Sequence, residues 1–106
     1  MKPIDQLARE FVELHTAYRA GSALSNAARF AAQCADTPSH WNHWKQTRDL
    51  TMGIGEKMCA TYDEFQQACE IETGEYGMKT SYWKSRAYEL SGITEPQFYL
   101  PLIETA

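Results

Sequence analysis

The sequence predicts an all-α fold, and three observations support this prediction. Val occurs once in 106 residues and Ile is infrequent, so the residues that β-sheets favour are scarce. Apolar residues recur every three or four positions over two long segments, which is the spacing of a helix face that packs on a core. Pro38 stands between the two segments and favours a turn. We therefore expect one helical domain, residues 1–106, with a long antiparallel hairpin and a short C-terminal helix.

The first helix is expected to begin at Pro3, since proline suits a first helical turn and Asp5 adds a negative charge near the helix N-terminus. Gly21 leaves two interpretations open. It either ends this helix, with Ser22 capping the next one, or lies inside one long helix at a cost of about 1 kcal/mol relative to Ala. The spacing continues across Gly21 and favours the long helix. The stripe comprises Ile4, Leu7, Phe11, Leu14, Tyr18, Gly21, Ser25, Ala28 and Ala32.

A turn is predicted at residues 36–39, because Pro38 disfavours a helical conformation at Thr37 and suits the start of a following helix. The second helix is expected to continue to residues 73–74, Thr-Gly. Its pattern is weaker at residues 53–55, Gly-Ile-Gly, where a kink or break is an alternative. Its stripe comprises Trp41, Trp44, Arg48, Thr51, Gly55, Met58, Tyr62, Phe65 and Cys69.

The turn also predicts which residues face each other. If it centres near residue 37, residues whose numbers sum to about 74 lie opposite in the antiparallel pair. Gly21 would then face Gly53, which would allow close backbone approach. Two bulky indoles would fill the space that small side chains leave: Trp41 and Trp44 would pack against Ala28, Ala31 and Ala32.

The C-terminal part is expected to hold a loop, a short helix and a final turn. Two glycines predict a loop over residues 74–79, and Thr80 or Ser81 can cap a third helix that ends at Gly92. Beyond it, residues 94–96 resemble another helix start. Leu100, Leu102 and Ile103 are expected to pack on the hairpin.

Composition excludes several classes of protein. The net charge of −4 and the pI of about 5.3 argue against nucleic-acid binding by bulk charge. No segment resembles a membrane span or a secretion signal. Three Cys at irregular spacing do not form a disulfide framework, so we expect reduced thiols and a cytoplasmic protein.

The sequence gives only weak support for a metal site or a catalytic site. His40 and His43 share a helix face, and Cys34 and Cys59 would complete a zinc set, but the spacing matches no compact zinc motif. Residues 53–57 lack the spacing of a phosphate-binding loop. The remaining candidates are better explained by packing, with Cys59 and Cys69 in the core and His15 at its edge. We expect no catalytic residue, no metal and no cofactor.

Residues 78–88 carry three basic and three aromatic side chains and no acid, which suits a short nucleic-acid contact. The simpler interpretation is an amphipathic helix with its aromatic residues inward and its basic residues in water. The stretch before it, residues 58–78, holds five acidic residues, and the two segments could neutralise each other.

By elimination, the leading hypothesis is a small non-enzymatic interaction protein, an adaptor, regulator or inhibitor, that docks on another macromolecule. The surplus of aromatic residues for so small a core supports it, and a homodimer would cover the spare apolar stripes. Alternatives are a nucleic-acid-binding accessory protein and a metal-binding or Cys-dependent protein. No motif connects the chain to a known family, although its small size and acidity are typical of bacterial and phage accessory proteins. The candidate interaction residues are Tyr82, Trp83, Lys84, Arg86 and Tyr99.

Overall fold

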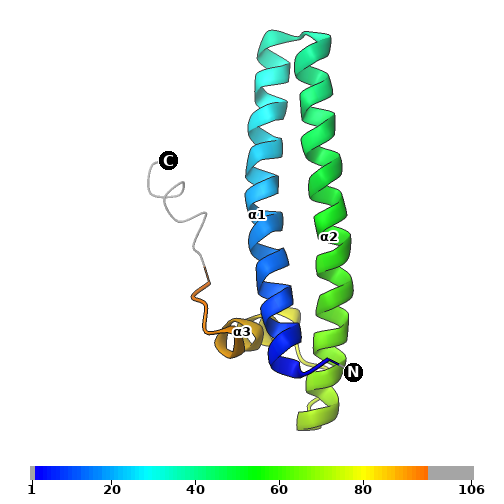
Figure 1. Ribbon diagram of the computed structural model, residues 1–106, viewed down its shortest axis with the longest axis vertical. Helices are drawn as coiled ribbons and strands as arrows, with labels where there is room; N and C mark the ends of the chain where they lie inside the picture. Colours follow the sequence, from blue (N-terminus) through cyan, green and yellow to red (C-terminus); the bar gives the residue numbers. More distant parts are fainter. Residues whose placement is uncertain (1, 96–106) are drawn as a thin grey trace.

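The computed structural model describes residues 2–95 and confirms the all-α prediction. Helix α1 spans Ile4–Ala35, α2 spans Pro38–Thr73 and α3 spans Thr80–Ser91, and residues 2–95 contain no strand. The two long helices run antiparallel side by side, and α3 packs across their lower end, mainly on α1 (Figure 1). The predicted packing of Leu100, Leu102 and Ile103, the turn from Pro96 and the position of Tyr99 lie outside the described residues.

Both long helices are continuous. Gly21 lies inside α1, and Gly53 and Gly55 lie inside α2, with helical structure on either side of each. The alternatives of two shorter helices at Gly21 and of a break at residues 53–55 are therefore wrong. Tertiary packing along each helix outweighs the intrinsic cost of a glycine, which is about 1 kcal/mol.

Local chemistry explains where the helices begin and end. Asp36 ends α1 in a left-handed conformation, φ 52°, and its N–H donates to the Ala32 carbonyl. Thr37 caps α2, since its Oγ1 accepts the His40 N–H at 3.3 Å. Gly74 and Gly92 end α2 and α3 at positive φ, where a residue without Cβ is unstrained. The N-cap of α3 is Lys79, so the prediction of Thr80 or Ser81 is wrong: neither hydroxyl caps the helix.

The register of the hairpin differs from the predicted one by one or two residues. A Cβ on Gly21 would meet Thr51, and a Cβ on Gly55 would meet the ring of Tyr18, so facing residues sum to 72 or 73. Gly53 has nothing within 4 Å of its Cβ direction, and its predicted contact with Gly21 is wrong. The reason is the geometry of the helix. Gly53 is two residues from Thr51, which faces Gly21, and two residues correspond to a rotation of about 200°, so Gly53 points away from α1.

Near the turn, small and large side chains meet only in part as predicted. Ala32 and Ala28 are buried, and the register places them opposite Trp41 and Trp44, which are half-buried. Ala31 is exposed, so its predicted place under the indoles is wrong, because it lies a quarter turn or more off the contact line. The indoles meet edge to face, with ring centroids 5.7 Å apart.

The hydrophobic core occupies only the lower end of the hairpin, where three helices meet. There the N-terminal half of α1 and the C-terminal half of α2 pack with α3. Cys69 belongs to this core as expected, but Cys59 is exposed, so its predicted core position is wrong. The buried cluster comprises Leu7, Ala8, Phe11, Val12, Phe65, Ala68, Cys69, Trp83, Ala87 and Tyr88.

Candidate functional site

Residues 20–55 form a part of the hairpin that we call the distal arm. Within residues 2–95 the arm consists of two helices, because α3 packs at the opposite end (Figure 1). Two helices bury only one stripe each, and large apolar side chains remain in water. Leu24 is 64% exposed, Phe30 69%, Leu50 71% and Met52 56%. A surface with several exposed apolar side chains of this size is typical of a binding site.

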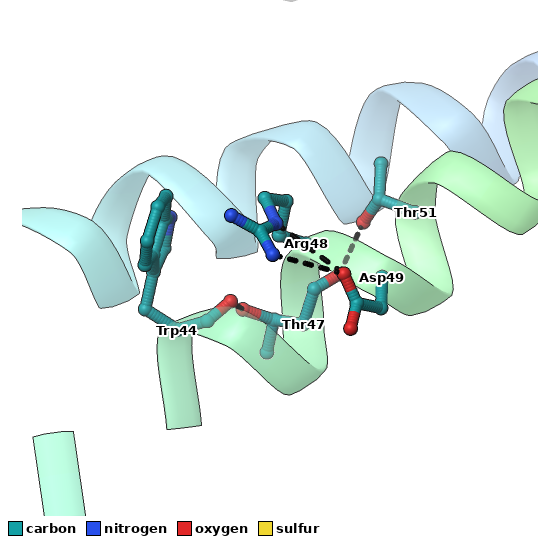
Figure 2. A network of polar contacts seen from close by, with 5 residues as sticks. All are labelled: Trp44, Thr47, Arg48, Asp49 and Thr51. Carbon is teal, nitrogen blue, oxygen red and sulfur yellow. Dashed lines mark hydrogen bonds and ion pairs between the residues drawn. The ribbon is translucent and has the colours of Figure 1, made fainter. Parts of the chain in front are cut away.

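The interior of the distal arm is held by close backbone approach and threonine hydrogen bonds. Thr51 is buried against Gly21, and its hydroxyl donates to the Thr47 carbonyl at 2.8 Å. The Thr47 hydroxyl donates in turn to the Trp44 carbonyl at 2.9 Å (Figure 2). These bonds satisfy hydroxyl groups at a helix contact, so Thr51 can be buried without an unpaired donor.

Arg48 lies between the hydrogen-bonded threonines of the arm and the ring of Trp44. Its guanidinium stands 4.8 Å from the centroid of the Trp44 ring and contacts the Asp49 carboxylate at 3.3 Å (Figure 2). Such stacking orders a charged side chain that is still 42% exposed. The arm therefore presents an oriented cation beside its apolar residues.

The distal arm has two different faces. On one, a groove of about 640 Å³ runs between the helices. It is lined by Ser22 and Asn26 from α1 and by Met52 from α2, among others, and it extends beyond the arm to Tyr18 and Cys59. Leu24 lies about 200° from both Ser22 and Asn26, and Leu50 lies about 200° from Met52, so both leucines face the other side.

We call that other side the Leu face. One and two turns on from Leu24 come Ala27 and Ala31, both exposed, and one turn on from Leu50 comes half-buried Ile54. These spacings of three, four and seven keep the side chains on one stripe of each helix. The Leu face comprises Leu24, Ala27, Ala31, Leu50 and Ile54.

No family model, no curated protein and no solved structure matches this chain. The function is therefore inferred from the geometry of the described residues. None of the helices in residues 2–95 is long and apolar enough to cross a membrane.

The predicted interaction residues of α3 separate into a buried one and exposed ones. Trp83 is 1% exposed and sits in the core, so its predicted role as an interface anchor is wrong: docking α3 on α1 requires this indole. Tyr82 is 39% exposed, and its hydroxyl donates to Glu75 at 3.0 Å. Tyr82 and Arg86 line a second hollow of about 790 Å³.

The basic residues of α3 have acidic neighbours. Lys84 Nζ lies 3.2 Å from Glu95, and Arg86 lies 3.7 Å from Glu89. The largest ring of the segment thus points inward, and Lys84 and Arg86 meet carboxylates of their own chain, whereas Lys79, Tyr82 and Arg86 line the second hollow together.

The predicted metal candidates are not brought together. His40 is part of the turn, where its Nδ1 lies 2.6 Å from Thr37 Oγ1, whereas Cys59 lines the groove about 28 Å further along α2. Within the described part of the chain, no three His, Cys, Asp or Glu side chains converge as a metal site would require.

His15 is half-buried at the edge of the core, as expected, and its contact with α3 was not predicted. Its Nδ1 lies 2.6 Å from the Tyr88 hydroxyl, and its ring stacks on Phe11 at 5.6 Å. Partial burial lowers the pKa of His15, and the nearby charges of Lys84 and Arg19 lower it further. A neutral His15 can accept a hydrogen bond from the Tyr88 hydroxyl, so this pair joins α1 to α3.

Proposed function

We propose that this protein is a small non-enzymatic interaction protein, an adaptor, regulator or inhibitor, that binds another protein through the Leu face of the distal arm. The observation that carries the proposal is the pair of leucines on one side of a two-helix arm, Leu24 at 64% and Leu50 at 71% exposure. Burying apolar surface yields about 25 cal/mol per Å², which makes such side chains effective anchors.

The shape of the arm indicates the kind of partner. Small residues on the same stripe of α1 as Leu24, Ala27 and Ala31, leave room for side chains of an approaching helix. A helical partner would complete a bundle of three or four helices, the arrangement in which two-helix arms bury their remaining stripes.

A nucleic-acid partner is less well supported by the charges on the surface. Lys84 and Arg86 contact Glu95 and Glu89, and the whole chain carries a net charge of −4. At Lys84 and Arg86, a phosphate would have to compete with these carboxylates.

A capture experiment tests the proposal. The immobilised protein is exposed to an extract of the organism that encodes it, alongside the variant Leu24→Ser/Leu50→Ser. A specific protein should bind the wild type and be lost from the variant, because the anchors are removed. The matched control is Ile71→Ser/Tyr76→Ser, which changes two side chains of similar exposure, 69% and 65%, outside the arm.

The control variant should retain the partner. If Leu24→Ser/Leu50→Ser binds as the wild type does, the Leu face is not the binding surface. Light scattering on the same samples tests the expected homodimer. A dimer that the leucine variant dissociates would mean that a second copy occupies this face instead of another protein.

A further inference from the structure

The outer side of α1 in the distal arm carries a second set of exposed apolar side chains, of which the Leu face uses only Ala27. Its members follow each other at spacings of three and four residues, the heptad spacing that keeps side chains on one side of a helix. Phe30 is the largest of them and is 69% exposed. We call this set the Phe30 stripe. It comprises Ala20, Ala23, Ala27, Phe30 and Cys34, all of which are exposed.

The Phe30 stripe points away from the other helix of the arm. At about 100° per residue, it lies about 140° around α1 from Gly21, Ala28 and Ala32, which face α2. Helix α3 lies on the outer side of α1 as well, but it packs at the lower end, where Tyr88 contacts His15 (Figure 1). Among residues 2–95, the stripe is therefore left open above α3.

The distribution of charge favours a second copy of this chain on the stripe. Residues 20–35 include a single charged side chain, Arg29, which lies about 140° around the helix from the centre of the stripe. Only two of the 14 acidic residues, Asp36 and Asp49, lie in the distal arm. Two copies with a net charge of −4 each can therefore approach arm to arm, and an antiparallel arrangement keeps their acidic ends apart.

The sizes of the side chains also fit a second copy. In an antiparallel pair of helices, residues that lie side by side across the contact have numbers with a constant sum. A sum of 57 places Phe30 beside Ala27 of the second copy, and Cys34 beside Ala23 of the second copy. Each layer then joins one alanine to one larger side chain, and the small residues allow the helix axes to approach to about 8 Å.

The neighbouring registers fit less well. A sum of 50 creates layers of two alanines, Ala23 beside Ala27, and a sum of 64 places Phe30 beside Cys34. With a sum of 57, the turn of the second copy comes level with Ala20, five residues above His15, so α3 is not in the way (Figure 1).

The extent of the contact indicates a weak dimer. The two α1 helices overlap over residues 22–35, a length of about 20 Å. This is small for a protein interface, so we expect association at roughly micromolar concentrations or above.

We propose that the protein forms an antiparallel two-fold dimer through the Phe30 stripe of α1. The two Leu faces then lie on the same side of the dimer, because a two-fold axis perpendicular to the helices keeps equivalent flanks together. The dimer does not depend on the leucine anchors. Leu24 lies about 100–120° around α1 from Ala23 and Phe30.

Light scattering between roughly 5 and 500 μM tests the association, because this range brackets the dissociation constants of weak pairs. Phe30→Ala should raise the dissociation constant at least tenfold, since each dimer loses two buried rings. The matched control Met52→Ala shortens a side chain that is 56% exposed on the groove face and should dimerise as the wild type does. A wild type that stays monomeric over this range, or a dimer that Phe30→Ala leaves unchanged, would overturn the proposal.

Disulfide formation tests the register. A disulfide requires Cα atoms about 4.4–6.8 Å apart. All variants carry Cys59→Ser, which removes the other exposed thiol, and Cys69 is buried. Ala23→Cys introduces a thiol beside Cys34 of the second copy, so mild oxidation should give a covalent dimer on a non-reducing gel. Adding Cys34→Ser should abolish it, because the two residues at position 23 lie about 16 Å apart in this register.

Ala35→Cys is the matched control for accidental collisions, since it also replaces an exposed alanine of α1. Its thiol would lie about 18 Å along the helices from Cys34 of the second copy and should give no covalent dimer. Equal oxidation of Ala23→Cys and Ala35→Cys, or no covalent dimer from Ala23→Cys, would contradict the register. These variants leave Leu24 and Leu50 unchanged, so failure of the dimer and failure of partner capture are separate results.

Discussion

Two glycines of the hairpin show how a single residue depends on its partner helix. A Cβ on Gly21 would lie 2.6 Å from Thr51 Oγ1, which is itself fixed by its bond to the Thr47 carbonyl. A Cβ on Gly53 would meet nothing within 4 Å. The same substitution should therefore have different effects on stability at the two positions.

We expect Gly53→Ala to raise the free energy of unfolding by about 1 kcal/mol, the difference in helix propensity. Gly21→Ala gains the same propensity but must displace a β-branched side chain, and overpacking costs about 1–3 kcal/mol. The Gly21→Ala variant should therefore be at most as stable as the wild type. Urea denaturation followed by circular dichroism measures both. Equal stabilisation by the two variants would contradict the close contact at Gly21.

At the scale of elements, α3 is attached to α1 by buried apolar side chains and by the pair His15–Tyr88. Trp83 supplies the largest buried side chain, although its Nε1 has no hydrogen-bond partner within the described residues. The polar part of the attachment depends on a neutral imidazole, because Lys84 and Arg19 are close and the ring is partly buried.

This attachment should make stability depend on pH. The folded-state pKa of His15 lies below the value of 6.5 for a free side chain, so the unfolded chain binds the proton more readily. The stabilising contribution is complete above 6.5 and is lost as the pH falls from there through the folded-state pKa. Unfolding free energies between about pH 7.5 and pH 5.5 should decrease with falling pH in the wild type.

The variant His15→Gln should show a flatter pH dependence over the same range, since it has no titrating ring at this position. His43→Gln removes an exposed imidazole of α2 and controls for the loss of a histidine as such. If His15→Gln keeps the wild-type slope, another group is responsible for the pH dependence.

The whole molecule is divided into a three-helix base and a two-helix arm. Every residue of the buried core cluster lies outside residues 20–55, whereas four large apolar side chains of the arm are exposed. Regions with few buried apolar contacts open at lower free energy than the core.

Amide hydrogen exchange should reveal this division. We expect amides of residues 20–55 to exchange on the order of tenfold faster than those of residues 4–15 and 58–70, because helix opening in the arm exposes less apolar surface. Exchange in the arm should slow when the Leu face is occupied. Uniform protection across both long helices in the isolated protein would contradict the division.

The sequence by itself determined the three helices, the turn between the two long ones and the C-terminal ends of α2 and α3. The three-to-four spacing, Pro38 after Thr37, and the glycines at 74 and 92 act within a few residues of the chain, so no knowledge of the fold is needed to interpret them. The apolar stripes of the two long helices also predict part of the core, since Phe11 and Phe65 are both buried in it.

Only the tertiary structure decided the register and the surfaces. A turn placed one residue earlier moves Gly53 from the helix contact to the outside, and a local pattern does not resolve so small a shift. Docking of α3 at one end buries Trp83 and leaves Leu24 and Leu50 in water. These outcomes depend on where helices distant in sequence meet, because packing is a property of the assembled faces and periodicity is a property of each helix alone.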